Sequence, residues 1–168
     1  LGTLYAQDPG TRLAPALLRA QPGERVLDVC AAPGGKSLLL ADAMQRGELV
    51  CVDQPGPRLV PLRENLAKLG SYPNLNVTLL PMDARELNPA THGNFDAILL
   101  DAPCSATGTI RRHPEVAWNR RAEDVASLAA AQALLLERVS GWLKPGGRLL
   151  CLEFSEVDMP VLDKIYEA

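Results

Sequence analysis

The stretch Asp28-Val29-Cys30-Ala31-Ala32-Pro33-Gly34-Gly35-Lys36-Ser37 decides the fold. It follows an apolar run typical of a buried strand and leads into a segment with helical spacing, so it predicts a strand, a turn of small residues and a helix start. Small residues let a ligand approach the backbone, where free N–H groups and the positive end of a helix dipole are offered. This geometry suits a carboxylate and a phosphate equally. The loop therefore predicts a ligand-binding site but does not distinguish between these two kinds of ligand.

Two familiar nucleotide-binding loops do not fit this stretch. Gly35-Lys36-Ser37 resembles the end of a P-loop, but that motif needs a Gly where Cys30 stands. The dinucleotide fingerprint G-x-G-x-x-G needs spaced glycines, whereas the only glycines of this loop are adjacent. Both mismatches disfavour an NTPase and a hydride-transfer enzyme.

Strand-like and helix-like segments alternate along the chain. Apolar runs of strand length occupy residues 25–30, 48–53, 75–81, 95–101 and 147–154. Helical segments are predicted at 34–45, 57–69 and 122–143, with a leading helix at 11–19. The alternation predicts a Rossmann-like α/β fold: a mostly parallel, twisted sheet with helices on both faces and ligands at the carboxyl ends of the strands.

Acidic residues follow the second and third predicted strands. Asp53 lies 25 residues past Asp28, and an acid at this strand tip, about 20 residues on in dinucleotide-binding folds, accepts the ribose hydroxyls. We therefore expect Asp53 to bind ribose, with helix capping as the alternative. Asp83 lies at the same edge, in reach of an adenine amino group, with a solvated turn as its alternative reading.

Composition limits the classes of protein. The 168 residues, 47% of them hydrophobic and 22% charged, predict a single globular domain. A net charge of −3 disfavours a non-specific nucleic-acid coat but leaves a local basic patch open. Because no apolar run approaches the ~20 residues of a membrane span and no leader pattern opens the chain, we expect a cytoplasmic protein without a membrane partner. Four isolated cysteines and two histidines predict neither disulfides nor a metal site.

A carboxylate and a thiol follow the fourth predicted strand together. Asp101 ends that strand and Cys104 comes three residues later, in a polar loop. A lone cysteine is usually a small buried hydrophobe, but a polar loop over the ligand crevice is a poor place for one. We therefore interpret Asp101 and Cys104 as catalytic candidates.

Three segments resemble the Sun-type (RsmB-like) ribosomal RNA cytosine-5 methyltransferases over about residues 5–150: DVCAAPGGKS at 28–37, MDAREL at 82–87 and DAPCSATGTIRRHPEVAW at 101–118. The resemblance implies a class I methyltransferase fold, S-adenosyl-L-methionine as cofactor and RNA, foremost ribosomal RNA, as substrate. It also implies a cofactor site made by Cys30, Ala31, Ala32, Pro33, Gly34, Gly35, Lys36, Asp53, Arg58, Asp83 and Asp101.

The resemblance explains the thiol but also exposes a departure. C5 of cytosine attacks a methyl donor only after a thiolate has added to C6, and Asp101 near the ring N3 would stabilise that adduct. The family uses two cysteines; Cys104 matches the one that assists product release, whereas Phe154 stands where the nucleophile should be. Cys151 lies three residues too early and, by strand alternation, on the opposite face. We therefore expect impaired catalysis.

A basic and aromatic cluster follows the reactive loop. Arg111, Arg112, Trp118 and Arg121 predict an RNA-binding face, since arginine contacts phosphate and an aromatic ring stacks on a flipped base. The alternative is a solvated loop whose Trp packs on the sheet. The single domain then divides into a leading helix (1–22), a cofactor-binding core (23–110) and an RNA-facing loop, long helix and last strand (111–168).

The last segment, residues 143–168, resembles instead the UbiE-type ubiquinone and menaquinone biosynthesis methyltransferases. This predicts a fragment or a splice of two families, truncated after the fifth strand, with an exposed strand edge that favours self-association. Two alternative functions therefore stay open: a C-methyltransferase acting on a quinone precursor, and a catalytically inert module that binds cofactor or RNA.

Overall fold

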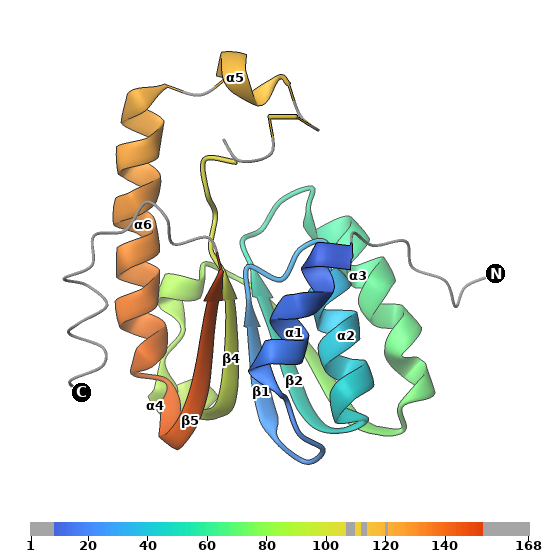
Figure 1. The fold of residues 1–168 in the computed structure, drawn as a ribbon. Helices are drawn as coiled ribbons and strands as arrows, with labels where there is room; N and C mark the ends of the chain where they lie inside the picture. Colours follow the sequence, from blue (N-terminus) through green and yellow to red (C-terminus); the bar gives the residue numbers. More distant parts are fainter. Residues whose placement is uncertain (1–8, 107–109, 112–113, 120, 153–168) are drawn as a thin grey trace.

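The computed structural model describes residues 9–106, 110–111, 114–119 and 121–152. Its centre is a sheet of five parallel strands in the order β3-β2-β1-β4-β5 (Figure 1). The strands are β1 (Arg25–Val29), β2 (Arg46–Asp53), β3 (Asn74–Pro81), β4 (Phe95–Asp101) and β5 (Leu143–Leu152). The predicted parallel α/β sheet is confirmed.

Helices cover both faces of this sheet (Figure 1). One face carries α1 (Leu13–Leu18), α2 (Gly35–Met44) and α3 (Leu59–Ala67), and the other carries the long α6 (Ala122–Ser140). The sequence did not predict the short elements η1 (Pro9–Arg12), η2 (Lys68–Ser71), η3 (Ala84–Glu86), α4 (Pro89–His92) and α5 (Val116–Asn119). In the described part of the chain, no helix is long and apolar enough to cross a bilayer.

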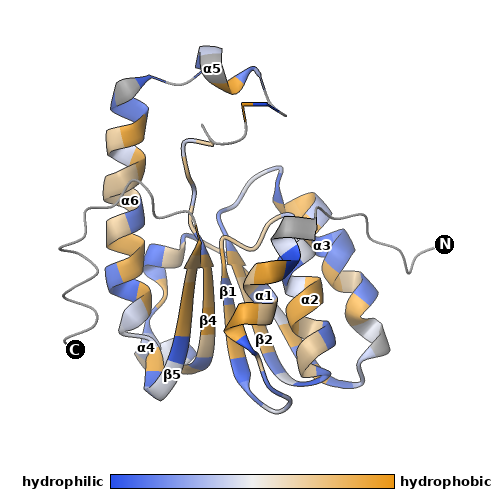
Figure 2. Ribbon diagram, viewed as in Figure 1, coloured by the Kyte–Doolittle hydropathy of each residue, from blue (hydrophilic) through white to orange (hydrophobic). Residues whose placement is uncertain are grey.

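The strands carry apolar side chains on both faces, as strands covered on both sides must. Val26 and Leu99 pack towards α1, α2 and α3, whereas Leu27 and Ile98 pack into a second cluster against α6. Figure 2 shows the strands apolar along most of their length and hydrophilic at their lower, amino-terminal ends. The two cores hold the strand tips at the opposite end in fixed positions.

The sheet order reverses beside β1, which pairs with both β2 and β4. Val29 at the end of β1 lies opposite Val52 of β2 on one side and Leu100 of β4 on the other. The chain after β1 turns to one face and the chain after β4 to the other, which opens a crevice at the carboxyl ends of these strands. Ligand-binding residues should therefore follow β1, β2 and β4.

The fifth strand begins earlier than predicted, at Leu143, and α6 ends at Ser140. Pairing with β4 starts at Phe95 opposite Leu143 and resumes at Ala97 opposite Arg148, with a register shift between them. Residues 144–146, which precede the predicted fifth strand, therefore lie inside β5, at the shift in its register with β4.

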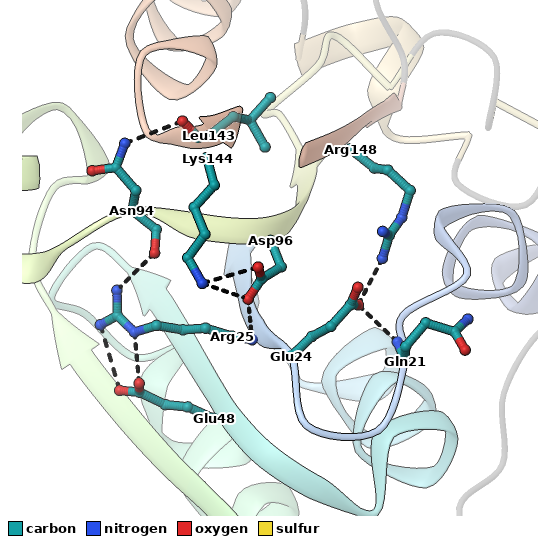
Figure 3. A network of polar contacts seen from close by, with 9 residues as sticks. All are labelled: Gln21, Glu24, Arg25, Glu48, Asn94, Asp96, Leu143, Lys144 and Arg148. Carbon is teal, nitrogen blue, oxygen red and sulfur yellow. Dashed lines mark hydrogen bonds and ion pairs between the residues drawn. The ribbon is translucent and has the colours of Figure 1, made fainter. Parts of the chain in front are cut away.

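Polar residues tie the strands together at their amino-terminal ends, away from the crevice (Figure 3). Arg25 Nε donates to Glu48 Oε2 at 2.6 Å, joining β1 to β2. Arg148 Nη2 donates to Glu24 Oε2 at 2.6 Å, joining β5 to the segment before β1. This end of the sheet is a structural clamp, which leaves the opposite end for ligands.

Candidate active site

A cavity of about 490 Å³ opens at the carboxyl ends of the strands. Among the predicted cofactor residues, its walls include Cys30, Lys36, Asp53, Arg58, Asp83 and Asp101. A smaller cavity of about 110 Å³ shares Cys30, Lys36 and Asp101 with it and also borders Ala31, Ala32, Pro33 and Gly35. The structure thus brings together every predicted cofactor residue except Gly34, which lines neither cavity.

The cofactor loop is fixed from outside by polar contacts with β2 and α3. Asp53 Oδ2 accepts the Ala32 N–H at 2.8 Å. The Ala32 carbonyl accepts from Arg58 Nη2 at 2.8 Å, and the Pro33 carbonyl accepts from Asn65 Nδ2 at 2.8 Å. The loop backbone is therefore held rigidly at the cavity wall.

Gly34 shapes the loop without lining the cavities. Its φ of +100° lies in the left-handed region, and a Cβ there would lie 3.0 Å from Leu62 Cδ1 and 3.3 Å from Asn65 Cβ. Only glycine adopts this conformation freely, so its role is to bring α3 close to the loop.

Asp53 lies at the tip of β2, buried beside the cofactor loop. The alternative reading, a cap for the next helix, does not describe its contacts, because the N-cap of α3 is Arg58 and no side chain caps that helix. One carboxylate oxygen bonds the loop, and the residue also lines the main cavity. Ribose binding by Asp53 remains a prediction.

Asp83 makes local contacts after β3. It caps η3 by accepting the Arg85 N–H, and it also pairs with the Arg85 guanidinium. The hydrogen bond from Arg85 is the main reason why the pKa of Asp83 falls to about 2, and Gln54 Nε2 adds another at 3.0 Å. The turn reading thus describes its observed contacts, and the adenine contact remains a prediction.

Gln54 and Arg85 are cavity residues that sequence reasoning missed. Gln54 directly follows the ribose candidate Asp53, and Arg85 lies inside the MDAREL segment. Their positions next to Asp53 and Asp83 were the signal that could have found them.

Lys36 and Asp101 meet where the two cavities share a wall. The Lys36 ammonium lies 2.6 Å from Asp101 Oδ2, and both side chains are mostly buried. The contact joins the start of α2 to the tip of β4 and sets a positive and a negative charge side by side at the ligand crevice.

Asp28 is a buried acid to which the sequence pattern assigned no role. It is fully buried in β1, and Ser37 Oγ donates to its Oδ2 at 2.6 Å. Its Oδ1 has no hydrogen-bond partner in the described part of the chain. Burial raises the pKa of Asp28 to about 7, and the residue lines the smaller cavity.

The four cysteines differ in environment. Cys104 lines the main cavity and is half-buried. Burial raises the pKa of Cys30 and of Cys151 to about 12, and it also raises the pKa of Cys51. Cys151 packs into the core on the α6 side. A thiolate, the reactive form, is therefore disfavoured at these three positions. Phe154 lies outside the described residues.

The predicted RNA-binding residues lie beyond the strand tips. Trp118 is on α5, past the upper end of α6 (Figure 1), and 88% of its surface is exposed. The alternative reading, in which this Trp packs on the sheet, is wrong. Arg111 and Arg121 are exposed as well, and Arg112 lies outside the described residues. RNA binding itself remains a prediction.

The five-strand parallel sheet with a crevice at the carboxyl ends of its strands matches class I methyltransferase structures, a class that uses S-adenosylmethionine. The crystal structure of NSun6 from Pyrococcus horikoshii with SFG superimposes with a TM-score of 0.79 at 29% identity, covering 99% of this chain and 43% of that one. The chain belongs to the 16S rRNA methyltransferase RsmB/F family, whose sequence profile matches residues 15–156.

Relatives named ribosomal RNA small subunit methyltransferase B agree with this assignment. The protein from Pseudomonas syringae pv. tomato is 46% identical over 151 residues, covering 89% of this chain and 33% of its own length. The Vibrio vulnificus protein is 40% identical over 165 residues, covering 98% of this chain and 38% of its own length. The chain therefore spans about a third of these relatives. Its last segment aligns with the same family, and the resemblance of that segment to UbiE-type enzymes receives no support.

Proposed function

We propose that this chain transfers a methyl group from S-adenosylmethionine to C5 of a cytosine in ribosomal RNA. The observation that carries the proposal is that Asp101 and Cys104, from the tip and following loop of β4, line the same cavity as the cofactor loop. The methyl acceptor and the cofactor would thus meet in one crevice, as the displacement requires.

The residues present fit the cofactor. The main cavity, about 490 Å³, is in the size range of small-molecule sites. Asp53 and Asp83 would hold the ribose and adenine ends, and the loop of residues 30–36 the methionine end. When bound, the cofactor supplies an electrophilic methyl group. The protein binds it, orients it towards the β4 loop and excludes water with the apolar side chains Ala131 and Leu135 of α6.

On the substrate side, Asp101 and Cys104 would act on the cytosine ring. The Asp101 carboxyl would stabilise the ring near N3. After methyl transfer, the Cys104 thiolate would accept the C5 proton, so that the C5–C6 double bond re-forms and the bond between C6 and the nucleophile breaks. Trp118 and the exposed Arg111 and Arg121 would hold the RNA by stacking and phosphate contact. The nucleophilic attack on C6 is the step in question, because Phe154 stands at the family's nucleophile position.

Transfer of labelled methyl from S-adenosylmethionine to unmodified ribosomal RNA tests the proposal. The chain, Phe154→Cys and Cys104→Ala should be assayed in parallel. Label from the unaltered chain that is lost in Cys104→Ala would make Cys104 a sufficient nucleophile. Label from Phe154→Cys alone would mean an intact scaffold without its nucleophile. No label from any of them, with cofactor still bound, would refute the proposal.

Phe154 favours a second candidate, a module that binds cofactor and RNA without turnover. Cofactor affinity without methyl transfer to any RNA would identify it.

Self-association also stays a proposal: among the described residues, β5 pairs with β4 alone, which leaves its other edge open to a second copy of the chain. Sedimentation that shows a monomer would refute it.

A further inference from the structure

Gln132 is a buried polar residue on the cavity side of α6. It is completely buried, between the cavity-lining residues Ala131 and Leu135. Its Nε2 donates a hydrogen bond of 2.9 Å to the carbonyl oxygen of Pro103. Pro103 directly precedes Cys104, so this bond connects the long helix to the reactive loop across the cavity wall.

The oxygen of the Gln132 amide, Oε1, has no hydrogen-bond partner among the residues that the structure describes, and the nearby helix positions Leu135, Leu136 and Val139 are all buried hydrophobes. A buried acceptor without a partner lowers stability relative to an apolar side chain of the same shape. Packing alone would therefore favour Leu or Met at this position. What Gln132 adds, compared with such an apolar residue, is the hydrogen bond to the Pro103 carbonyl.

The loop that Gln132 holds has little regular structure of its own. Residues 102–106 form neither helix nor strand. Ala106 has a φ of +60°, in the left-handed region that residues with a side chain adopt at a cost. Such a conformation persists only when surrounding contacts determine it, so a restraint from a rigid helix matters here.

We propose that Gln132 is a positioning residue that fixes the backbone at Pro103 and thereby presents the Cys104 thiol to the cavity. The inference deepens the proposed function and rests on it for its catalytic meaning. The positioning itself is measurable without methyl transfer, because thiol reactivity reports where Cys104 lies.

Alkylation of Cys104 by iodoacetamide tests the proposal on the 168-residue chain. Peptide mapping follows Cys104, and the raised pKa values of Cys30, Cys51 and Cys151 keep those thiols slow at pH 8. Gln132→Met removes the donor at nearly constant volume. Gln132→Leu also removes the donor together with the unpaired oxygen, and it serves if Gln132→Met does not fold. Leu136→Met is the control for a volume-conserving change in the same helix.

The intact bond holds the Cys104 thiol half-buried at the cavity wall. We therefore expect the alkylation rate constant of Cys104 to rise by about threefold or more in the Gln132 variants, because a released loop exposes the thiol to solvent more often. The thermal midpoint of Gln132→Met should stay within about 2 °C of the original, since an unsatisfied amide oxygen is removed together with the bond. An unchanged rate constant, or the same rise in Leu136→Met, would overturn the proposal. Altered reactivity in a chain that methylates no RNA would retain the positioning role and refute only the proposed function.

Discussion

The Lys36 ammonium lies 2.6 Å from Asp101 Oδ2, although the two residues are 65 positions apart in the sequence. The pair lies between the two cavities, where the methionine end of S-adenosylmethionine is expected to bind. That end carries an ammonium group of its own. Lys36 and the cofactor would therefore share one carboxylate, and the balance of charge at Asp101 should control cofactor affinity.

Asp101→Asn should raise the dissociation constant for S-adenosylmethionine about tenfold, because a charge-assisted hydrogen bond is lost and the Lys36 ammonium then repels the cofactor. The double variant Lys36→Met/Asp101→Asn removes this repulsion, so it should bind more tightly than Asp101→Asn alone. Isothermal titration calorimetry measures all three proteins. Equal affinities for the single and the double variant would show that the Lys36 ammonium does not repel the cofactor once Asp101 is neutral.

Asp28→Asn should change the pH dependence of stability. Burial raises the pKa of Asp28 to about 7 in the folded protein, against 3.8 for an unburied carboxyl. Between these pH values the unfolded chain binds fewer protons than the folded one, so this carboxyl makes the free energy of unfolding fall as pH rises. Asparagine does not titrate, so its free energy of unfolding lacks this dependence on pH. The free energy of unfolding of the variant should therefore rise relative to that of the original chain, by up to about 1.4 kcal/mol per pH unit from pH 4 to 7.

Urea unfolding at half-unit steps from pH 4 to 8 measures this difference. Glu64→Gln, at an exposed position of α3, is the control and should follow the pH profile of the original chain. Parallel profiles for Asp28→Asn and the original would mean that Asp28 is already ionised in the folded protein at pH 4.

Gly34→Ala should destabilise the fold by about 1–3 kcal/mol, because a side chain would be forced into a left-handed conformation against Leu62 and Asn65. Gly56→Ala is the matched control: a Cβ at residue 56 would have no neighbour within 4 Å, and the change should stay within about 0.5 kcal/mol. Chemical denaturation compares the two. Equal costs would show that the loop adapts to a side chain at residue 34.

The sequence predicted the positions of the strands and the acids at their tips because both depend on local pattern. The alternation of predicted strands and helices indicates which residues end each strand. Parallel pairing then brings Asp53 and Asp101 to the same, carboxyl-terminal edge of the sheet. The early start of β5 was not predictable, because it depends on pairing with β4 across a register shift rather than on local propensity.

Contacts between distant elements explain why Asp28 and Gln132 were missed. Asp28 reads as part of an apolar strand, and Gln132 reads as one polar residue in a helix. Only the packing of α2 shows that Ser37 donates a hydrogen bond to Asp28, and only the packing of α6 shows that Gln132 donates one to Pro103. Local sequence pattern does not predict such pairs. A polar residue in an otherwise apolar segment is the feature of the sequence that indicates them.

Arg148→Met should lower stability by about 1 kcal/mol without changing cofactor affinity, because the residue belongs to the clamp at the amino-terminal ends of the strands (Figure 3). Its guanidinium donates to the Leu18 and Arg19 carbonyls at 3.1 and 3.3 Å and to Glu24. Lys144→Met, which removes a largely exposed pair with Asp96, should cost less. Thermal unfolding and calorimetry check both, and a weaker cofactor complex in Arg148→Met would mean that the clamp is coupled to the cavity.

Trp118→Ala should weaken RNA binding by about 1–3 kcal/mol, the usual contribution of a ring that stacks on a base. Stability should not change, because 88% of the Trp118 surface is exposed and little packing is lost. Val60→Ala is the control, since it also removes an exposed apolar side chain, on α3 instead of α5. Fluorescence anisotropy with a labelled single-stranded RNA measures affinity. Equal affinities for both variants would refute a contribution of the Trp118 ring to RNA binding.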